Sequence, residues 1–317
     1  MLASLLIILP IFAIIAAGYF CGRKGLLGPT ASSELNRFVV YLALPALLFD
    51  VLAESNWASF WQPSFIASFT IGSFVVYGGT LLCRVRQGHK LSDASIDGLN
   101  AGYANTGYIG FPLCELIFGR QSFALVTIAA ILTVTLLFAV AIVFVEIGVQ
   151  TERRPGALAL KVGKSLLRNP LVIAPALGAL WAALGVPLPD AAKNLLHLMS
   201  GAASPCALVS LGLFLAARHK GSKSGRPAAM MLTALKLFAQ PAITAICAYF
   251  VFRMAAFPSA VAVVLAALPT GTGPFMIAEF YKREAVVTSG TILFSTVASV
   301  VTLSVCVLLL GHVAPPA

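Results

Sequence analysis

The sequence has few charged residues. Asp, Glu, Lys and Arg together make up 10% of its 317 residues, whereas they make up about 25% of a typical soluble domain. Hydrophobic residues account for 59%, and the mean hydropathy is +0.95. A soluble fold needs a larger share of polar residues for its surface. The composition therefore excludes a soluble protein and predicts an all-α polytopic membrane protein.

Motifs typical of enzymes are also missing. There is no phosphate-binding loop, which argues against ATP hydrolysis. His89, His219 and His312 fall in loops or near segment ends, and His197 stands alone, so the histidines form no metal-ligand pattern with acidic residues. No nucleophile is paired with a base. We expect no enzyme activity, no metal site and no cofactor.

The six cysteines have no C-x-x-C spacing. Metal-binding and redox cysteines usually come in close pairs, whereas these are scattered through apolar segments. They are expected to be small buried hydrophobic residues. Their positions are 21, 83, 114, 206, 247 and 306.

Acidic residues are scarce, and the net charge is +10. This charge would suit nucleic acid, but the basic residues fall in short connections between apolar segments, where the positive-inside rule explains them without a nucleic-acid partner. With the N-terminus outside, 17 of the 21 Lys and Arg fall in inner connections, three in outer ones (Arg120, Lys193 and Arg253), and Lys236 lies within a span. We predict that both termini are external and that Arg153, in the central connection, is internal.

Ten apolar segments are predicted to cross the bilayer. No Lys or Arg precedes the first, and no small-residue cleavage site follows it, so it is expected to remain in the mature protein. The longest polar connection, residues 150–168, lies at the midpoint. The predicted spans are 2–21, 38–53, 65–83, 94–118, 123–145, 170–184, 191–217, 228–252, 259–281 and 286–310.

The two halves of the chain, residues 1–158 and 159–317, repeat one order of features. Each half has a proline in its second span (Pro45, Pro205), an interrupted fourth span and a Ser/Thr-rich fifth, and Pro112 precedes its counterpart Pro274 by 162 residues. Five spans per half give the halves opposite orientations. Inverted repeats with interrupted helices indicate a secondary transporter, although two helices can also share a few residue types by chance.

The interrupted fourth and ninth spans are the centre of this prediction. Residues 105–112 (N-T-G-Y-I-G-F-P) and 268–274 (L-P-T-G-T-G-P) do not suit a continuous helix. Broken backbone at membrane depth survives only where protein buries it or where it lines a cavity. We expect one helix to break just before Pro112 and the other just before Pro274, and the two breaks to meet at mid-membrane.

A helix that restarts after a break has free N–H groups and a partial positive charge at its start. Two such starts would bind an anion such as a carboxylate. The simpler alternative is that the glycines and prolines only kink the helices for packing. The predicted substrate-binding residues are Asn105, Thr106, Gly107, Tyr108, Gly110 and Pro112 in the fourth span, and Thr270, Gly271, Thr272, Gly273 and Pro274 in the ninth.

Acidic residues in or near the spans are candidates for ion coupling. Glu115 and Glu279 lie just past the two breaks, which favours proton coupling through them, with a salt bridge or a water-exposed turn as the alternative. Asp50 and Glu146 sit near span ends and could reach water. Sodium coupling would instead use carbonyl and hydroxyl oxygens at the breaks.

The residues around both breaks resemble the auxin efflux carrier family, which includes bacterial malonate or malate carriers and plant auxin exporters. The likeness covers nearly the whole chain, from Pro10 and residues 41–49 to the last span. The motifs that carry it are Ala104-Asn105-Thr106-Gly107, Gly110-Phe111-Pro112-Leu113 and Leu268-Pro269-Thr270-Gly271-Thr272-Gly273-Pro274-Phe275.

This resemblance implies a fold shared with bile acid:sodium symporters and a role in carboxylate transport. Spans 1, 2, 6 and 7 would form a scaffold and dimer domain, with Pro45 and Pro205 breaking its helices. Spans 3–5 and 8–10 would form a mobile transport domain. Asn105 would contact the substrate, as would the residues before Pro274. A homodimer in the bacterial inner membrane, with periplasmic termini and elevator-like alternating access, would follow. Plant members carry a long central loop; the connection here is confined to residues 150–168, so regulation through it is not expected.

Two other functions stay open on the sequence alone. A membrane sensor would bind its ligand without moving it. A cation/proton antiporter also uses inverted repeats and crossed broken helices, but it would be expected to have adjacent aspartates or a lysine at the crossing, and the sequence shows neither. The substrate, the direction of transport and the coupling ion are not specified by the sequence.

Overall fold

The computed structural model describes residues 2–54, 61–150, 155–217, 225–283, 285–310 and 313. Over these residues the chain is helical, and its only strand-like pairing is an isolated antiparallel bridge between Ala104 and Thr270. The predicted all-α class is therefore confirmed for the described part of the chain.

Six helical segments are long and apolar enough to cross a membrane, whose hydrocarbon core needs about 20 apolar residues. Three of the six contain short π-helical turns, named η. The segments are Ala31–Ala53 (α2 Ala31–Phe38, η1 Val39–Ala43, α3 Leu44–Ala53), Pro63–Arg86 (α4), Phe123–Val149 (α7 Phe123–Ile131, η4 Leu132–Leu137, α8 Phe138–Val149), Asp190–Ala217 (α11), Arg226–Val251 (α12 Arg226–Ala234, η5 Leu235–Ala239, α13 Gln240–Ala245, η6 Ile246–Val251) and Ala285–Leu310 (α16).

A seventh candidate is the pair α9 (Pro155–Leu166) and α10 (Pro170–Leu184), which is bent by 71° at its break. The sequence predicted a polar connection at 150–168, so α9 is an additional element. Its Val162 is buried while Lys161 and Lys164 are exposed. This one-sided pattern is that of a surface helix, which explains why hydropathy alone did not predict it.

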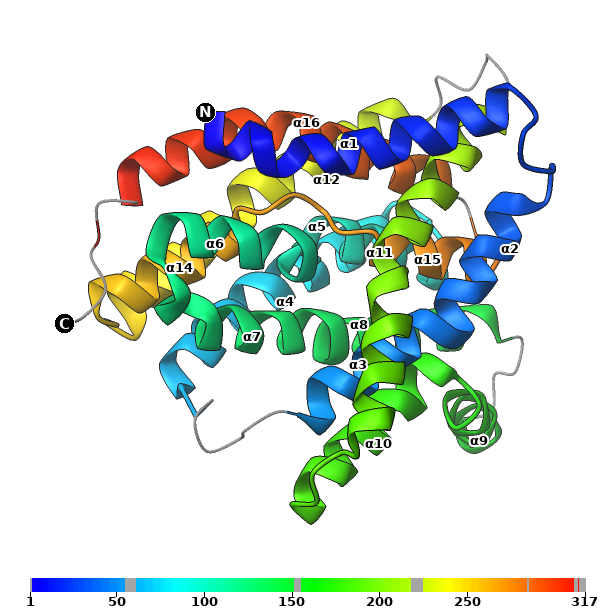
Figure 1. Ribbon diagram of the computed structural model, residues 1–317, viewed down its shortest axis with the longest axis horizontal. Coiled ribbons are helices and arrows are strands. Elements are labelled where there is room, and N and C mark those ends of the chain that lie inside the picture. Colours follow the sequence, from blue (N-terminus) through cyan, green and yellow to red (C-terminus); the bar gives the residue numbers. More distant parts are fainter. Residues whose placement is uncertain are drawn as a thin grey trace.

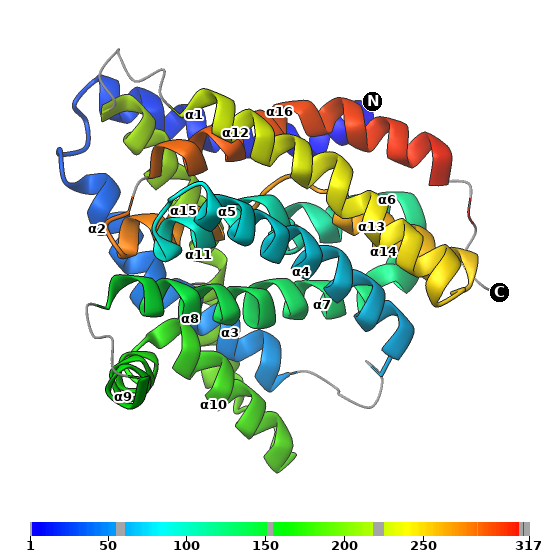
Figure 2. The same cartoon turned by 180° about the vertical axis from the view of Figure 1, so that it is seen from behind.

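Besides the short 3₁₀ turn η3 (Arg120–Ser122), the described residues form three further elements. They are α1 (Leu2–Arg23) and two interrupted helices. The first interrupted helix consists of α5 (Leu91–Gly102), η2 (Thr106–Gly110) and α6 (Phe111–Phe118). The second consists of α14 (Ala256–Ala266) and α15 (Gly273–Phe280). Figures 1 and 2 show the interrupted helices running in opposite directions through the middle of the molecule, joined at their extended pieces. Each half-helix is too short to cross a membrane alone.

Prolines inside the long helices are accommodated without a break. Pro45, Pro112 and Pro241 each stand two residues after a π-helical turn. A proline clashes with the carbonyl four residues earlier, and the wider turn moves that carbonyl aside. Pro205 lies inside α11. The prediction that Pro45 and Pro205 break their helices is therefore wrong, because the helix around Pro45 widens and α11 continues through Pro205.

The helices pack in two groups, and the crossing belongs to the second group and faces the first. In one group α1 packs along α11, and α10 and α11 pack on α3. In the other, α4, α5 and α8 pack together, α13 packs on α4 and α14, and α12 packs on α16. The half-helix α15 contacts both groups, through α2 and η1 on one side and through α5 and α16 on the other.

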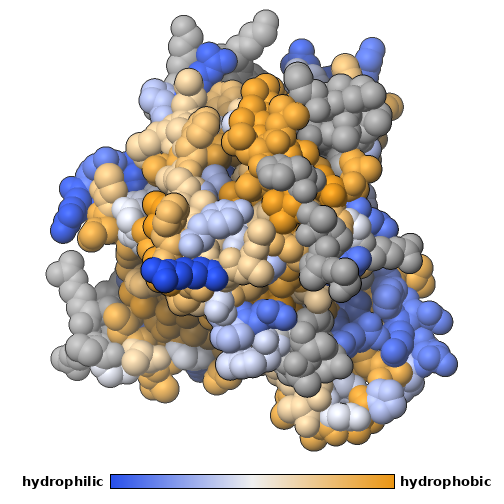
Figure 3. All heavy atoms as spheres, turned by 90° about the vertical axis from the view of Figure 1, so that its left-hand side faces the viewer, coloured by the Kyte–Doolittle hydropathy of each residue, from blue (hydrophilic) through white to orange (hydrophobic). Residues whose placement is uncertain are grey.

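Large apolar side chains cover much of the outer surface. Phe20, Leu198, Phe250 and Leu308 are among the most exposed, and an apolar surface this extensive suits lipid contact. Figure 3 views the side of the molecule nearest α6, α7 and α14, where hydrophilic patches interrupt the hydrophobic surface. Figure 1 shows that α1 begins and α16 ends toward this same side.

Candidate functional site at the crossing of two interrupted helices

Backbone hydrogen bonds join the two breaks to each other. The N–H of Asn105 donates to the carbonyl oxygen of Pro269 at 2.9 Å, and the N–H of Gly271 donates to the carbonyl oxygen of Tyr103 at 3.2 Å. Lipid offers no partner for exposed backbone groups, so extended chain inside an apolar bundle must be satisfied by protein. This reciprocal pairing satisfies some of the backbone groups of both breaks and joins the breaks into one structure.

Thr270 anchors the crossing to neighbouring helices. Its hydroxyl donates to the carbonyl oxygen of Asn100 at 2.8 Å, and its N–H donates to Oγ of Ser295 at 3.1 Å. Asn100 in turn donates through Nδ2 to the hydroxyl of Thr288 at 2.9 Å. The polar groups of Thr270 are therefore occupied by the fold, although the sequence predicted a substrate contact there.

Two side chains of the Arg226–Val251 segment cap the carbonyl ends of the half-helices. Gln240 donates through Nε2 to the carbonyl oxygen of Gly102 at 3.1 Å, at the end of α5. Lys236 donates through Nζ to the carbonyl oxygen of Ala266 at 2.7 Å, at the end of α14, and is fully buried. A cation is stabilised at a helix C-terminus by the helix dipole. The prediction that no lysine lies at the crossing is wrong, because Lys236 reaches it from another helix.

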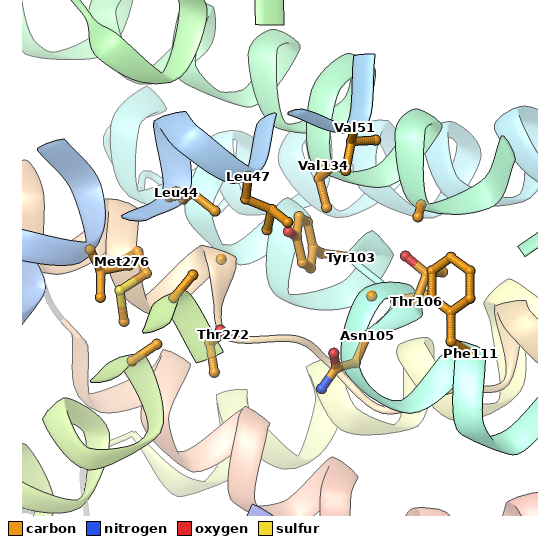
Figure 4. A pocket seen from close by; sticks show the side chains of 17 residues that line it. Leu44, Leu47, Val51, Tyr103, Asn105, Thr106, Phe111, Val134, Thr272 and Met276 are labelled. Atoms are coloured by element: carbon orange, nitrogen blue, oxygen red, sulfur yellow. The ribbon is translucent and has the colours of Figure 1, made fainter. Parts of the chain in front are cut away.

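A cavity of about 130 Å³ lies against the crossing. Its wall combines the breaks and the helix starts that follow them with residues from α7, η4 and the other packing group (Figure 4). The cavity is therefore bounded by both groups of helices. The group of α3 and α11, with η1, contributes Val39, Leu44, Leu47, Val51, Ala203 and Ala207.

Few polar side chains face this cavity. Asn105, Thr106 and Thr272 line it together with Tyr103, and no charged side chain does so among the described residues. Thr106 is 1% exposed, and its hydroxyl has no hydrogen-bond partner among the described residues. Asn105 is 8% exposed and also lines the cavity. A buried polar group without a protein partner is a natural contact for a ligand or water.

Both restarted helices begin at the cavity wall. Thr106 and Gly107 open η2, Thr272 and Gly273 stand at the start of α15, and all four line the cavity. No hydrogen bond found among the described residues uses the backbone N–H of Gly107 or Gly273. Free N–H groups at two helix starts give the wall a positive potential without any charged side chain.

The fourth span restarts earlier than predicted. A break just before Pro112 was expected, but η2 already forms a helical turn over Thr106–Gly110 and continues into α6. Gly110 packs toward Leu265, and Pro112 is exposed; neither lines the cavity. The pairing of the two breaks holds the extended chain near Ala104, and the π-helical turn gives Pro112 the room that the prediction assigned to a break. The side chain of Tyr108 lies outside the described residues.

In the ninth span the ring of Tyr103 explains the two glycines. A Cβ atom on Gly271 would lie 2.8 Å from Cε1 of Tyr103, and one on Gly273 would lie 2.7 Å from its Cζ. Any larger residue would displace the ring. Gly271 and Pro274 do not line the cavity; Pro274 is buried in the first turn of α15, where its missing N–H costs nothing.

Sequence reasoning missed part of the wall. Tyr103, Phe111 and Met276 lie next to the predicted motifs, but nothing in their residue types distinguishes them from packing residues. Ala203 and Ala207 lie on one face of α11, on either side of Pro205. Small residues at this four-residue spacing are a weak signal of close helix approach that could have indicated this face.

Neither predicted coupling residue lines the cavity. Glu115 is exposed on α6. Glu279 is half-buried near the end of α15, and its carboxylate makes no hydrogen bond or ion pair with the described residues. Both follow the breaks in sequence, as predicted, but they lie away from the polar groups of the cavity.

His197 does not stand alone, contrary to the prediction. Its Nε2 lies 3.8 Å from Oδ2 of Asp50, and ligand atoms of these two residues and Glu54 lie within 4.8 Å of one another, a set that could hold a metal ion. Lys193 already pairs with Glu54 at 2.9 Å. We interpret the group as an ion-pair network that joins the end of α3 to the start of α11.

Comparisons with known proteins agree with this architecture. A family model described as "Membrane transport protein" matches residues 4–307. The "Putative malonate transporter" of Rhizobium meliloti (strain 1021) is 28% identical over 98% of this chain and 97% of its own length. "Auxin efflux carrier component 8" of Arabidopsis thaliana is 24% identical over 90% of this chain and 91% of its own length.

The "Uncharacterized transporter YfdV" of Escherichia coli (strain K12) is 28% identical over 74% of each chain. The family match covers almost the whole sequence, including both breaks, and the relatives extend along most of it. This confirms the resemblance seen in the motifs around Asn105 and Thr270. The chain belongs to the membrane transport protein family that includes the auxin efflux carriers.

Proposed function

We propose that this protein is a secondary transporter that binds a small organic anion at the crossing of its two interrupted helices. One observation carries the proposal: the helix starts at Thr106 and Gly273 line the same cavity, which has free N–H groups and no charged wall residue among those described. Two helix starts favour a carboxylate over a cation or a neutral molecule. The cavity is therefore the proposed substrate site.

A short dicarboxylate is the substrate class that we favour. The cavity, at about 130 Å³, is smaller than the roughly 300 Å³ at which sites for drug-sized ligands begin. It suits a three-carbon diacid better than a larger aromatic acid. The name of the Rhizobium relative, "Putative malonate transporter", points to the same class.

The ten-span inverted repeat is part of the proposal. In this arrangement the ten spans would be the six long segments, the bent α9–α10 pair, α1 and the two interrupted helices. The reciprocal bonds at the bridge of Ala104 and Thr270 are what a two-fold relation between halves 1–158 and 159–317 would produce. An even number of crossings fits the nearby positions of the α1 start and the α16 end in Figure 1.

Movement between the two packing groups would give alternating access. The group that contains α1, α3, α10 and α11 would be the scaffold and the homodimer contact, and the crossing would move with α4, α5, α8, α12–α14 and α16. The cavity lies between the groups, so sliding one group past the other would carry the bound anion across the membrane. A proton or a sodium ion would drive the cycle, and Glu279 and Glu115 are the coupling candidates from sequence. A bacterial inner-membrane location with periplasmic termini completes the proposal.

Purified protein in proteoliposomes tests this function. We expect uptake of radiolabelled malonate under an imposed ion gradient, and an increase in melting temperature with malonate but not with malonamide, its uncharged diamide. A ligand that binds only the folded state stabilises it by mass action. Binding of malonate without flux would instead support a membrane sensor.

Equal stabilisation by malonamide and malonate would contradict an anion site at the helix starts. The cation/proton antiporter is the second candidate, and Lys236 at the crossing is the observation that favours it. Proton flux driven by a sodium or potassium gradient, without any carboxylate, would support that candidate over the carrier.

A further inference from the structure

Glu146 is the most buried acidic side chain among the described residues, at 4% exposed. It lies near the end of α8, and its Oε1 accepts a hydrogen bond from the hydroxyl of Tyr281 at 2.5 Å. Tyr281 follows directly after α15. A buried carboxylate in a membrane protein is costly and is usually retained for a role in function.

The same hydroxyl links the two packing groups. Asn169 precedes α10, and its Nδ2 donates to the hydroxyl oxygen of Tyr281 at 3.0 Å. Asn169 belongs to the group of α3, α10 and α11, whereas Glu146 and Tyr281 belong to the group that contains the crossing. The chain Asn169, Tyr281, Glu146, which we call the inner contact, therefore spans the surface along which the groups would have to move.

The donor and the acceptor of each hydrogen bond in the inner contact can be assigned. Oδ1 of Asn169 accepts from the N–H of Leu171 at 3.0 Å and caps α10, so only Nδ2 is left to face Tyr281. The oxygen of Tyr281 accepts that bond, and its single proton goes to Glu146. The contact is strongest when Glu146 is ionised, because hydrogen bonds to a charged acceptor are roughly twice as strong as neutral ones.

Aromatic packing completes the contact. Tyr41, from η1, lies edge-on to Phe280 with ring centroids 5.6 Å apart, and Phe280 lies edge-on to Tyr281 at 5.0 Å. Phe214 of α11 packs in the same way on Phe275 of α15 at 5.3 Å. The ends of α8 and α15 and the start of α10 are those that the distribution of basic residues places on the inner side. These ring contacts therefore hold the two groups together at this end.

Resting on the transport function proposed above, we propose that Glu146 is the proton-binding residue of the cycle, and that its protonation releases the inner contact so that the two helix groups separate at the inner side. A neutral Glu146 removes the charge that holds the Tyr281 hydroxyl. The Asn169 bond to Tyr281 weakens with it, because the two bonds polarise each other. Proton binding thus shifts the population toward the inner-open state.

Other charged groups lie on the elements around Glu146. Asp93 and Asp97 of α5 are paired with Arg283 and Arg84, and His89 lies near both acids. Among the described residues, the remaining groups on the elements that pack against α8 or carry the inner contact are Tyr41, Lys161, Lys164, Arg168, Glu279 and Lys282. A variant of Glu146 leaves all of them unchanged and so isolates its contribution.

The distance across the inner contact tests the proposal without any substrate. Spin labels at Leu167→Cys, before α10, and Arg86→Cys, at the end of α4, report on the two groups, and both positions are exposed. The background variant has the six native cysteines replaced. In lipid nanodiscs, electron–electron distance measurements on this background, with the inner contact unchanged, should show a longer-distance population about fivefold larger at pH 5 than at pH 8.

Four variants give the expected pattern. Glu146→Gln should show one distance distribution at both pH values. Asn169→Asp keeps the cap on Leu171 but loses the donor, so the longer distance should dominate already at pH 8. Glu34→Gln, which changes an exposed acid on α2, is the matched control and should respond to pH like the parent. If Glu146→Gln does not fold, Tyr281→Phe, which keeps the carboxylate but breaks the link, should likewise lose the pH response.

A pH response in Glu146→Gln equal to that of the parent would overturn the proposal, as would a parent protein whose distances do not change with pH. In a further variant, Glu279→Gln, loss of the pH response while Glu146→Gln keeps it would assign the proton to Glu279 and overturn the proposal. Because no carboxylate substrate is added to the sample, the result does not depend on whether malonate is transported.

Discussion

The backbone N–H of Asn105 donates to the carbonyl oxygen of Pro269 at 2.9 Å, so the break in the fourth span is held by the break in the ninth. The side chain of Asn105 takes no part in this bond and stays available at the cavity. Backbone and side chain of one residue therefore serve two purposes, of which one maintains the crossing and the other faces the proposed substrate. Substitution of the side chain should separate them.

Asn105→Ala is expected to weaken carboxylate binding by roughly 10- to 150-fold, since a hydrogen bond to a charged group contributes about 1.5–3 kcal/mol. Folding should be unaffected because the backbone bond to Pro269 remains. Malonate titration of the purified protein measures the effect. Asn194→Ala, an exposed asparagine on α11, is the control and should bind like wild type. Unchanged affinity in Asn105→Ala would place the substrate elsewhere.

Pro112→Ala should reduce transport roughly tenfold or more while the melting temperature stays the same or rises. With alanine the π-helical turn Thr106–Gly110 can tighten into an α-helix, which moves Thr106 and Gly107 away from their positions at the cavity. Pro175→Ala in α10 lies away from the cavity and should transport normally. Wild-type flux in Pro112→Ala, with the substitution verified, would make the π-helical turn irrelevant to the site.

Gly273→Ala and Gly107→Ala form a matched pair. At Gly273 the new methyl group would lie 2.7 Å from the ring of Tyr103, whereas at Gly107 it meets nothing within 4 Å. We expect Gly273→Ala to lower the free energy of unfolding by about 1–3 kcal/mol through overpacking.

Gly107→Ala should keep its stability but bind malonate more weakly, because the methyl group enters the cavity. Thermal denaturation and ligand titration of both variants distinguish the two effects. If both variants lose stability equally, then the space around Gly107 is filled by packing.

The membrane orientation can be tested with reporter fusions. The excess of 17 basic residues over three predicts a fusion at Arg153 on the inner side and one at Pro316 on the outer side. Both positions lie outside the described residues. An internal C-terminus would rule out the ten-span arrangement and, with it, the inverted repeat.

Local properties of the sequence were sufficient to predict the class of the protein and the position of the two breaks that form the crossing. Apolar runs of about 20 residues predict spans wherever they occur, and Gly and Pro within residues 105–112 and 268–274 predict irregular backbone because they disfavour helix in any context. Asn105, Thr106, Gly107, Thr272 and Gly273 were predicted this way, and all five line the cavity.

The tertiary structure decided what the remaining residues do. Whether Pro112 ends a helix or is accommodated by a π-helical turn depends on the extended chain being held by a segment more than 150 residues away. Lys236 caps α14, and Tyr103 covers two glycines. Both contacts also depend on partners distant in sequence.

The same holds for the inner contact of Asn169, Tyr281 and Glu146, three residues from three separate elements. A pattern along one chain segment records which face is apolar and where helix is disfavoured. It does not record which polar atoms meet, because that depends on packing between segments. The site class followed from the sequence, and the partners of each polar atom followed only from the fold.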